Sequence, residues 1–371
     1  MSSYLAHFSI IRPVHELSQV SIFEWIIEAH ERAERAKSNR VEEEWFSGLK
    51  ARLEKIGMGT EMVQNRGVQL GDFSHRDWEK MEIYKLAPLS PSGTPLRERM
   101  QFFDAACSGV FERFYPDEAP IAPHLIHVTC TGYVSPSPAQ KLVALRNRQE
   151  KTVVTHAYHM GCYASIPAIR LGLGHATDIV HTELASVHFN PLLHSSEQLV
   201  VQSLFADGFI KYSVLPEKQE GVALKILALH EVILPDSGHC MSWQCEEWGF
   251  RMTLTRELPV IIRNALEGFL KSLAEKAGCS LNDLKQNAYF AVHPGGPKIV
   301  KQVEELFQLE TWQLAHSRKV LRSCGNMSSA TLPHIWEKMV ADPKIKSGAR
   351  IVSLAFGPGL TMCGALFEKE I

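Results

Sequence analysis

The sequence lacks several features that would place a chain in a functional class at once. Its eight cysteines form no CxxC pair and follow no regular spacing, which excludes the usual patterns of a zinc site or a disulfide framework. The chain has 39 lysines and arginines and 41 aspartates and glutamates, which give a net charge of −2. No overall positive potential therefore favours the binding of nucleic acid. No apolar run approaches the roughly 20 residues that span a bilayer. We therefore predict reduced thiols, no metal, no nucleic-acid partner and no membrane span.

Targeting and linker sequences are also missing. The start, MSSYLAHFSIIRP, has no charged segment followed by a long apolar stretch, as a signal peptide would. We accordingly expect a cytoplasmic protein. There is no low-complexity tract, and the polar segment LPEKQEG is the best candidate for an internal boundary. With 45% hydrophobic residues the chain can bury a large core, and we predict one unit with two halves, residues 1–221 and 222–371.

The pattern of apolar residues alternates between strand and helix. Amphipathic stretches at 257–276 and 297–309 predict helices between β-rich runs, and this alternation indicates a layered α/β fold. The first hundred residues differ, because charged helical patterns at 23–36, 42–56 and 75–84 predict a helical cover over one face. The predicted strands are 125–130, 152–158, 178–184, 222–229, 288–293 and 350–356.

Cys162 stands where a predicted strand turns into a helix. It follows TVVTHAYHMG and precedes YASIPAIRLG, and Pro167 is tolerable only near a helix start. The unpaired N–H groups and the dipole of a first helical turn favour thiolate over thiol. A cysteine beside apolar residues is ordinarily a small buried hydrophobe, but this position makes Cys162 a candidate nucleophile.

His293 and Asn326 occupy two further glycine-containing turns. His293 ends a predicted strand and begins HPGGP, where the glycine pair indicates close backbone approach to a ligand. Most of the 17 histidines must be surface or core residues, and an asparagine in GNMSSA is as readily a helix cap. Together with Cys162, however, the imidazole and the carboxamide suit acyl transfer through a thioester, because both can stabilise charge on a thioester carbonyl.

Six segments, in order and approximate spacing, resemble the type III polyketide synthases, the chalcone-synthase-like branch of the thiolase superfamily. The resemblance covers about residues 120–371, whereas the first 120 residues match loosely. The pair HPGGP and GNMSSA is typical of this branch rather than of thiolases at large. The matching segments are GCYASIPAIRLG, LFADG, ILPDS, AVHPGGPKIVKQVEE, GNMSSATLPHIWEKM and AFGPGLT.

The resemblance implies a five-layer αβαβα fold of two related halves and a homodimer. It makes Cys162 the acyl-accepting nucleophile, and His293 and Asn326 the pair that promotes decarboxylation of a malonyl thioester. It implies acyl-CoA and malonyl-CoA as substrates and no metal or redox cofactor. The carbanion left by decarboxylation would attack the enzyme thioester and extend the chain by two carbons.

The resemblance also assigns the pocket. Phe205 matches a gatekeeper aromatic, while the second gatekeeper position falls on Met252, a departure from the family. Positions that carry hydroxyls in chalcone synthases hold Ala185 and His188, and His188 would either narrow the pocket or supply a new hydrogen bond. The residues expected near the nucleophile and in the cavity-shaping loop are Ser328, Phe356, Gly357, Pro358 and Gly359, and those expected to hold coenzyme A phosphates are Arg52, Lys55 and Arg66.

Several functions remain open at this stage. The first is an iterative enzyme that makes a short polyketide of the alkylpyrone or alkylresorcinol type. The second is a single-condensation ketosynthase that uses chains bound to an acyl carrier protein. The spacing of Cys162 and His293 also lies within the roughly 130–150 residues of papain-like hydrolases, but their cysteine signature is missing. Retention of all three polar groups argues against a non-catalytic subunit.

Overall fold

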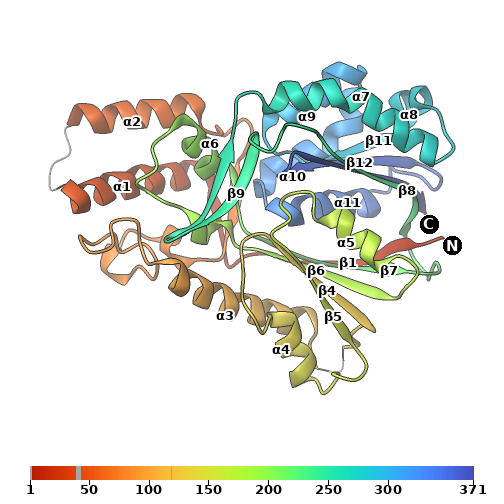
Figure 1. Ribbon diagram of the computed structural model, residues 1–371, viewed down its shortest axis with the longest axis horizontal. Helices are drawn as coiled ribbons and strands as arrows, with labels where there is room; N and C mark the ends of the chain where they lie inside the picture. The colour runs from red at the N-terminus through yellow and green to blue at the C-terminus, as the bar shows by residue number, and fades with distance from the viewer. Residues whose placement is uncertain (1, 39–42, 118) are drawn as a thin grey trace.

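The computed structural model describes residues 2–38, 43–117 and 119–371, and its elements stack in five layers (Figure 1). The upper helices α7 (Leu258–Lys276), α8 (Leu281–Asn287) and α9 (Pro297–Phe307) cover one sheet. The middle layer holds α5 (Ser165–Gly172), α10 (Ala315–Cys324) and α11 (Thr331–Ala341). Below a second sheet lie α3 (Leu96–Phe114) and α4 (Pro138–Leu145). The predicted αβαβα architecture is therefore confirmed.

The strands of both halves form one continuous sheet of order β11-β12-β13-β8-β1-β7-β6-β4-β5. The two halves join where β1 pairs with β8 over only two residues, Tyr4 with Lys225 and Leu5 with Leu224, so the sheet divides into an upper and a lower part. The bounds are β1 Tyr4–Ile11, β4 His124–Thr129, β5 Val153–Tyr158, β6 Thr177–Glu183, β7 Gly208–Leu215, β8 Ala223–Ile233, β11 Tyr289–Val292, β12 Arg350–Gly357 and β13 Thr361–Glu370.

Three buried apolar clusters fill the spaces between the layers. Because successive strand residues point to opposite faces, Leu366 packs against the upper helices while Phe367 packs into the middle layer. Helix α11 contacts β11 of the upper sheet and β7 of the lower sheet, and Trp336 lies in its buried face. Both sheets are thus covered on both faces, which explains the near-continuous apolar strands in the sequence.

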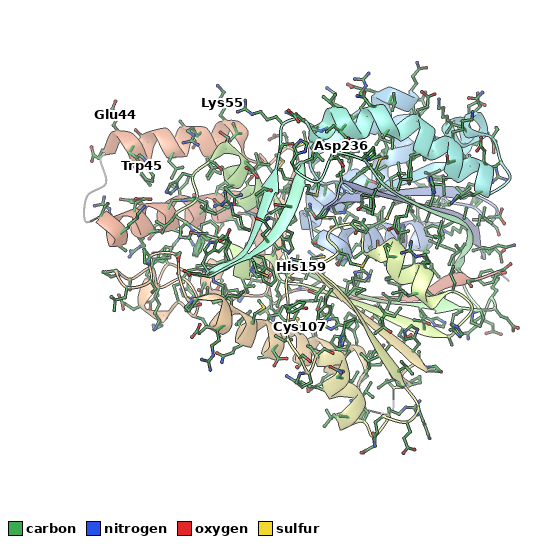
Figure 2. All side chains as sticks on the ribbon, viewed as in Figure 1. Glu44, Trp45, Lys55, Cys107, His159 and Asp236 are labelled. Atoms are coloured by element: carbon green, nitrogen blue, oxygen red, sulfur yellow. The ribbon has the colours of Figure 1, made fainter. Side chains whose placement is uncertain are left out.

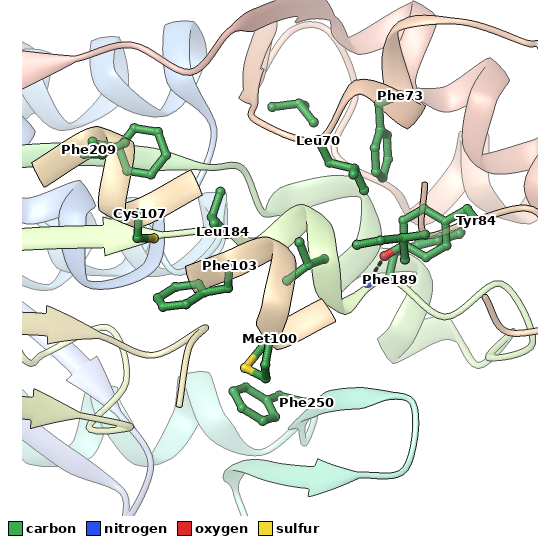
Figure 3. Close-up of a cluster of buried hydrophobic side chains, with 14 of the residues drawn as sticks. Leu70, Phe73, Tyr84, Met100, Phe103, Cys107, Leu184, Phe189, Phe209 and Phe250 are labelled. Atoms are coloured by element: carbon green, nitrogen blue, oxygen red, sulfur yellow. Dashed lines mark hydrogen bonds between the residues drawn. The ribbon is translucent and has the colours of Figure 1, made fainter. Parts of the chain in front are cut away.

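The third cluster lies between the lower sheet and the N-terminal helices. Figure 3 shows Phe103 and Cys107 of α3 beside Leu184 and Phe209, with Tyr84 at the far end. Helices α1 (Gln19–Ser38) and α2 (Glu43–Ile56) extend this cluster away from the sheets, with α6 (Ser196–Leu204) beside them (Figure 1). The predicted helices at 23–36 and 42–56 are present, although residue 42 lies outside the described residues.

Two predictions for the first hundred residues were wrong. Residues 4–11 form β1 at the centre of the sheet rather than part of a helical cover. Residues 75–84 are mostly loop, with a single 3₁₀ turn at Trp78–Lys80. The reason is Asp72, whose carboxylate accepts the backbone N–H groups of Glu82, Ile83 and Tyr84 and holds them out of a helix.

A two-stranded hairpin, β9 (Met241–Glu246) and β10 (Gly249–Leu254), crosses from the upper layers toward the N-terminal helices (Figure 1). A second small sheet pairs β2 (His15–Ser18) with β3 (Asn65–Val68). Within the described ranges, we find no helix that combines the length and the apolar character required to cross a bilayer.

Candidate active site

The fold brings the three predicted polar groups to one cavity. Cys162, His293 and Asn326 come from three distant segments, and all three line a space of about 340 Å³. Their side chains are almost completely buried, with exposed fractions of 5%, 1% and 0%. The rest of the wall is largely apolar, with Phe205, Met241, Met252, Leu254, Leu258, Ile262, Gly295, Ile299 and Phe356. The cavity therefore places a thiol, an imidazole and a carboxamide among largely apolar side chains.

Cys162 lies in a turn that a glycine makes possible. Gly161 has a φ of +89°, and a Cβ there would meet Pro358 Cδ at 2.5 Å, so no side chain fits. The turn leads into α5 at Ser165, as the sequence predicted. Cys162 Sγ lies 3.8 Å from Ser328 Oγ, so the predicted neighbour of the nucleophile is in place.

Burial opposes the thiolate form that the sequence predicts at Cys162. Burial raises the pKa of the Cys162 thiol to about 12, because an apolar cavity disfavours the charged form. Burial likewise lowers the pKa of His293 to about 3. Burial therefore favours an uncharged thiol and an uncharged imidazole in this cavity, and the thiolate expected at Cys162 stays a prediction.

His293 is positioned by a backbone hydrogen bond, and its ring nitrogens are free to interact with a substrate. Its N–H donates to Leu354 O at 2.8 Å, which fixes the residue at the end of β11. Among the described residues, neither ring nitrogen has a hydrogen-bond partner, although both are buried. A neutral ring has one N–H donor and one bare nitrogen, so His293 can donate one proton and accept another.

Asn326 presents its amide nitrogen to the cavity. Its Oδ1 accepts the backbone N–H of Ser328 at 2.9 Å and the hydroxyl of Thr331 at 3.3 Å. This leaves Nδ2 as the free end, and within the described part of the chain Nδ2 has no partner. Asn326 is thus a positioned donor rather than a helix cap, because its oxygen is occupied by its own loop.

A buried carboxylate, which the sequence analysis did not place in the site, ties two loops together. Glu183 accepts the N–H of Cys130 at 3.0 Å, the hydroxyl of Thr131 at 2.8 Å and the hydroxyl of Ser329. It therefore joins the segment beside Cys162 to the Asn326 loop. Burial raises its pKa, partly offset by these donors. A glutamate that ends a β-rich run was the available sequence signal.

A second space adjoins the nucleophile and leads away from it. Ala185, Phe205 and Met252 line both this space and a larger cavity of about 630 Å³ next to the N-terminal helices. Trp243 lines both as well, and its indole N–H donates to Cys130 O. Trp243 was not among the predicted pocket residues. The three spaces therefore share walls, with Phe205 and Met252 in all three.

The remaining predicted residues divide into those near the cavity and those far from it. Phe356 and Pro358 line it, and Gly357 is required because a Cβ there would meet Tyr163 at 2.3 Å. Gly359 belongs to the same turn but lines none of these spaces. Arg52 and Lys55 are exposed on α2, where Figure 2 shows Lys55.

Arg66 differs from these two exposed cations. It is buried and donates from Nη1 to the backbone carbonyls of Gln202 and Phe205 at 2.8 Å each. It lines the large cavity next to the N-terminal helices rather than the protein surface. This placement does not suit a surface phosphate contact, whereas such a role for Arg52 and Lys55 stays a prediction.

Comparison with known proteins supports the sequence resemblance. Residues 225–369 match the family model for the C-terminal domain of chalcone and stilbene synthases. Type III polyketide synthase C of Arabidopsis thaliana is 30% identical over 263 residues, which cover 66% of this chain and 67% of that protein. The chain belongs to the type III polyketide synthases. A further relative, Probable polyketide synthase 1 of Dictyostelium discoideum, is 26% identical over 277 residues.

Type III polyketide synthases of solved structure share the complete fold with this chain. The C-terminal type III domain of Steely1 from Dictyostelium superposes with a TM-score of 0.82 at 20% identity, covering 100% of both chains. PKS-I of the brown alga Ectocarpus siliculosus gives 0.81 at 19% identity over 100% and 98%. The match covers 9% of the length of the Dictyostelium curated relative, so this chain corresponds to a small part of that protein.

One departure of this type III synthase from its family is resolved by the structure. His188 Nε2 donates to Thr131 O at 2.8 Å, while Nδ1 accepts the N–H of Phe250 at 3.0 Å. Burial lowers the pKa of His188 to about 3, so the ring is neutral with its proton on Nε2. Both nitrogens are occupied, and His188 forms cavity wall rather than a hydrogen-bond donor for substrate.

The raised pKa of Cys162 predicts a steep pH dependence for its alkylation. Because the pKa is about 12, the thiolate fraction grows about tenfold per unit from about pH 7 to about pH 10. Iodoacetamide labelling of the free enzyme, followed by mass spectrometry of the Cys162 peptide, should show this slope. The exposed Cys245 serves as the internal comparison. A Cys162 rate that levels off below pH 9 would contradict the effect of burial.

Proposed function

We propose that this synthase joins an acyl starter to malonyl units by decarboxylative condensation, with the growing chain held as a thioester on Cys162. The supporting observation is the shared cavity, in which one thiol faces two positioned donors whose polar ends are free of protein partners among the described residues. A buried nucleophile beside such donors suits thioester chemistry, since charge develops on a carbonyl oxygen where water cannot screen it.

Loading begins from a neutral thiol. Cys162 Sγ attacks the starter thioester while its proton passes to the bare nitrogen of His293, so thiolate forms only as the new bond does. The backbone N–H of Cys162 is the proposed donor to the resulting oxyanion. Collapse breaks the bond to the coenzyme A sulfur, which takes the proton from His293 and leaves as a thiol. His293 returns to its neutral form, consistent with its lowered pKa.

Extension then uses the same two donors differently. The thioester oxygen of malonyl-CoA accepts hydrogen bonds from the His293 N–H and from Asn326 Nδ2. As carbon dioxide leaves, its bonding electron pair moves to the adjacent carbon, and the charge is shared with this oxygen as an enolate. The carbanion attacks the acyl carbon on Cys162 and breaks the C–S bond. The Cys162 thiolate that leaves takes up a proton from solvent, and the product is a β-ketoacyl thioester of coenzyme A.

The starter chain has a place to lie beyond the nucleophile. We propose an opening past Ala185 and Met252, because both residues line both spaces, and it would lead into the cavity whose walls include Ile22, Val68 and Phe73. An apolar tail there would be removed from water, which favours binding by about 0.8 kcal/mol per methylene group. This supports a fatty acyl starter and products of the alkylpyrone or alkylresorcinol type.

Substitution of Ala185 tests this path. Ala185→Phe should lower kcat/KM for a lauroyl starter at least about tenfold, because the ring would fill the opening. The value for an acetyl starter should change less than about threefold, because that group is too short to reach it. Ala185→Gly is the matched control and should retain lauroyl activity. Equal losses for both starters in Ala185→Phe would contradict the proposed path.

The two condensing functions differ in the carrier that delivers the acyl starter, coenzyme A or an acyl carrier protein. Purified enzyme with acyl-CoA and malonyl-CoA alone should yield products extended more than once. Products that appear only with carrier-bound chains, and that stop after one extension, would instead establish the single-condensation ketosynthase.

The homodimer and the cytoplasmic location stay predictions. Strand β5 ends the sheet in this chain, and its exposed Val153 makes it the natural edge for a second copy.

A further inference from the structure

Three potential metal ligands lie together at the base of the β9–β10 hairpin. His239 and Cys240 end the loop before β9, and Glu257 stands just before α7. Their nearest ligand atoms all lie within 4.8 Å of one another. Figure 2 labels Asp236 in the same loop, next to the start of the upper helices. The proposed acyl-transfer chemistry uses none of the three side chains.

Two of the three distances match a tetrahedral zinc site. Cys240 Sγ lies 3.5 Å from His239 Nε2, and this nitrogen lies 3.3 Å from Glu257 Oε2. Usual zinc bond lengths at tetrahedral angles place sulfur and nitrogen about 3.6 Å apart, and nitrogen and oxygen about 3.4 Å apart. The third pair, Cys240 with Glu257, needs to close by at most about 1 Å to reach the same geometry.

The loop that carries Cys240 is held in place by the fold. Cys240 N donates to Ser237 O at 2.9 Å, and Cys240 O accepts the N–H of Thr255 at 3.0 Å. The Ser237 hydroxyl in turn accepts the N–H of Leu360 at 2.8 Å. The cysteine is therefore fixed against the hairpin and against β13. A fixed thiol is a suitable anchor for a metal ion, because little order is lost on binding.

The other two ligands can move to meet a metal ion. The side chains of His239 and Glu257 are 59% and 70% exposed, whereas Cys240 is fully buried. Solvent therefore reaches the cluster from one side, where a water molecule can be the fourth ligand. The exposed side chains also give an incoming ion an entry path.

We propose that His239, Cys240 and Glu257 form a zinc-binding site. On binding, the Cys240 thiol releases its proton to solvent, and the thiolate, the neutral imidazole and the carboxylate coordinate the ion. One thiolate and one carboxylate balance the two positive charges. This nitrogen, sulfur and oxygen set suits Zn²⁺, whereas Mg²⁺ and Ca²⁺ prefer oxygen ligands alone. The inference goes beyond the proposed condensation and departs from the prediction of no metal.

A bound ion would act on the cavity through the two residues that follow its ligands. Met241 follows Cys240 and Leu258 follows Glu257, and both line the cavity of Cys162. The ion would tie the hairpin to the start of α7 and so hold two wall residues in register. This is a structural role, because the ligands do not touch the reacting groups.

Metal binding to the purified, chelator-treated protein tests the proposal without reference to activity. Co²⁺ should give the near-ultraviolet absorption of cobalt–thiolate coordination, and competition with Zn²⁺ should abolish it at one ion per chain. Cys240→Ser should remove the band, while Glu257→Gln and His239→Ala should each weaken Zn²⁺ binding at least about tenfold. Cys245→Ser is the matched control, because Cys245 is an exposed thiol on the same hairpin.

The two exposed ligands keep the test decisive if Cys240→Ser fails to fold. Glu257→Gln and His239→Ala change exposed side chains, and circular dichroism should show both folded. Metal affinity that is unchanged in both of these variants, or that falls equally in Cys245→Ser, would overturn the site. The absence of any cobalt–thiolate absorption in the unsubstituted protein at about a tenfold excess of Co²⁺ would overturn it as well.

Discussion

Cys162→Ala should lower condensation at least about 1,000-fold and abolish the acyl adduct on the protein, because no second thiol among the described residues lines the cavity that holds His293 and Asn326. Intact-protein mass spectrometry after incubation with lauroyl-CoA, with coenzyme A release measured alongside, checks both parts. A second thiol, that of Cys130, lines the adjoining space. Among the described residues that line this space, neither His293 nor Asn326 is present, so Cys130 is not placed to replace Cys162.

Cys245→Ala provides the control for this experiment. Its side chain is exposed and lies on the hairpin outside the cavity wall, so both the adduct and the activity should persist. If Cys162→Ala forms as much acyl adduct as the unsubstituted protein, another cysteine is the nucleophile, and peptide mapping would identify it. Adducts on both variants but no extended product from either would disprove the condensing function itself.

Asn326→Ala should lower malonyl-CoA decarboxylation about 100- to 1,000-fold while Cys162 still accepts the starter. The amide contributes Nδ2 to the enolate oxygen and takes no part in thiol attack, so the two steps separate. Release of labelled carbon dioxide measures the first step, and intact mass measures the second. His293→Ala should impair both steps, because the proposed mechanism uses this ring as a proton acceptor in loading and as a donor in extension.

Asn326→Asp is the informative companion to Asn326→Ala. It keeps the size and the acceptor that binds Ser328 N–H, but it replaces the donor with a second oxygen. Its decarboxylation should be as low as that of the alanine variant. Decarboxylation near the unsubstituted rate in Asn326→Asp would show that position, and not the N–H donor, is what Asn326 supplies. Loss of loading in Asn326→Ala would instead indicate a disturbed loop around Ser328.

Much of the fold was accessible from the sequence because its strands are buried on both faces. Runs such as DIVHTEL and RIVSLAF predicted β6 and β12 to within a residue or two. Residues 75–84 could not be assigned correctly, because the loop depends on Asp72, whose bonds to the backbone are not visible in a hydrophobic pattern. The first strand was missed for a similar reason, since its partners begin 197 residues or more along the chain, at Gly208 and Ala223.

Glycine-containing turns in the sequence marked Cys162, His293 and Asn326, and the fold brings all three to one cavity. The pKa shifts of Cys162 and His293 could not be predicted, because they depend on burial by residues from the whole chain. The orientation of the Asn326 amide depends on Thr331, which no spacing rule links to catalysis. The proximity of the three proposed zinc ligands could not be predicted for the same reason. His239 and Cys240 are neighbours in the sequence, but Glu257 comes close to them only because β9 and β10 fold back as a hairpin.

The central place of β1 has a consequence for synthesis on the ribosome. Residues 4–11 leave the exit tunnel well before their neighbours in the sheet, β7 and β8, which end at Leu215 and Ile233. Until those strands emerge, the apolar face of β1 has no native partner and is a target for chaperones or for pairing with another nascent chain. Strand β1 is therefore translated long before it can be ordered, and strands from both halves of the molecule complete the sheet on either side of it.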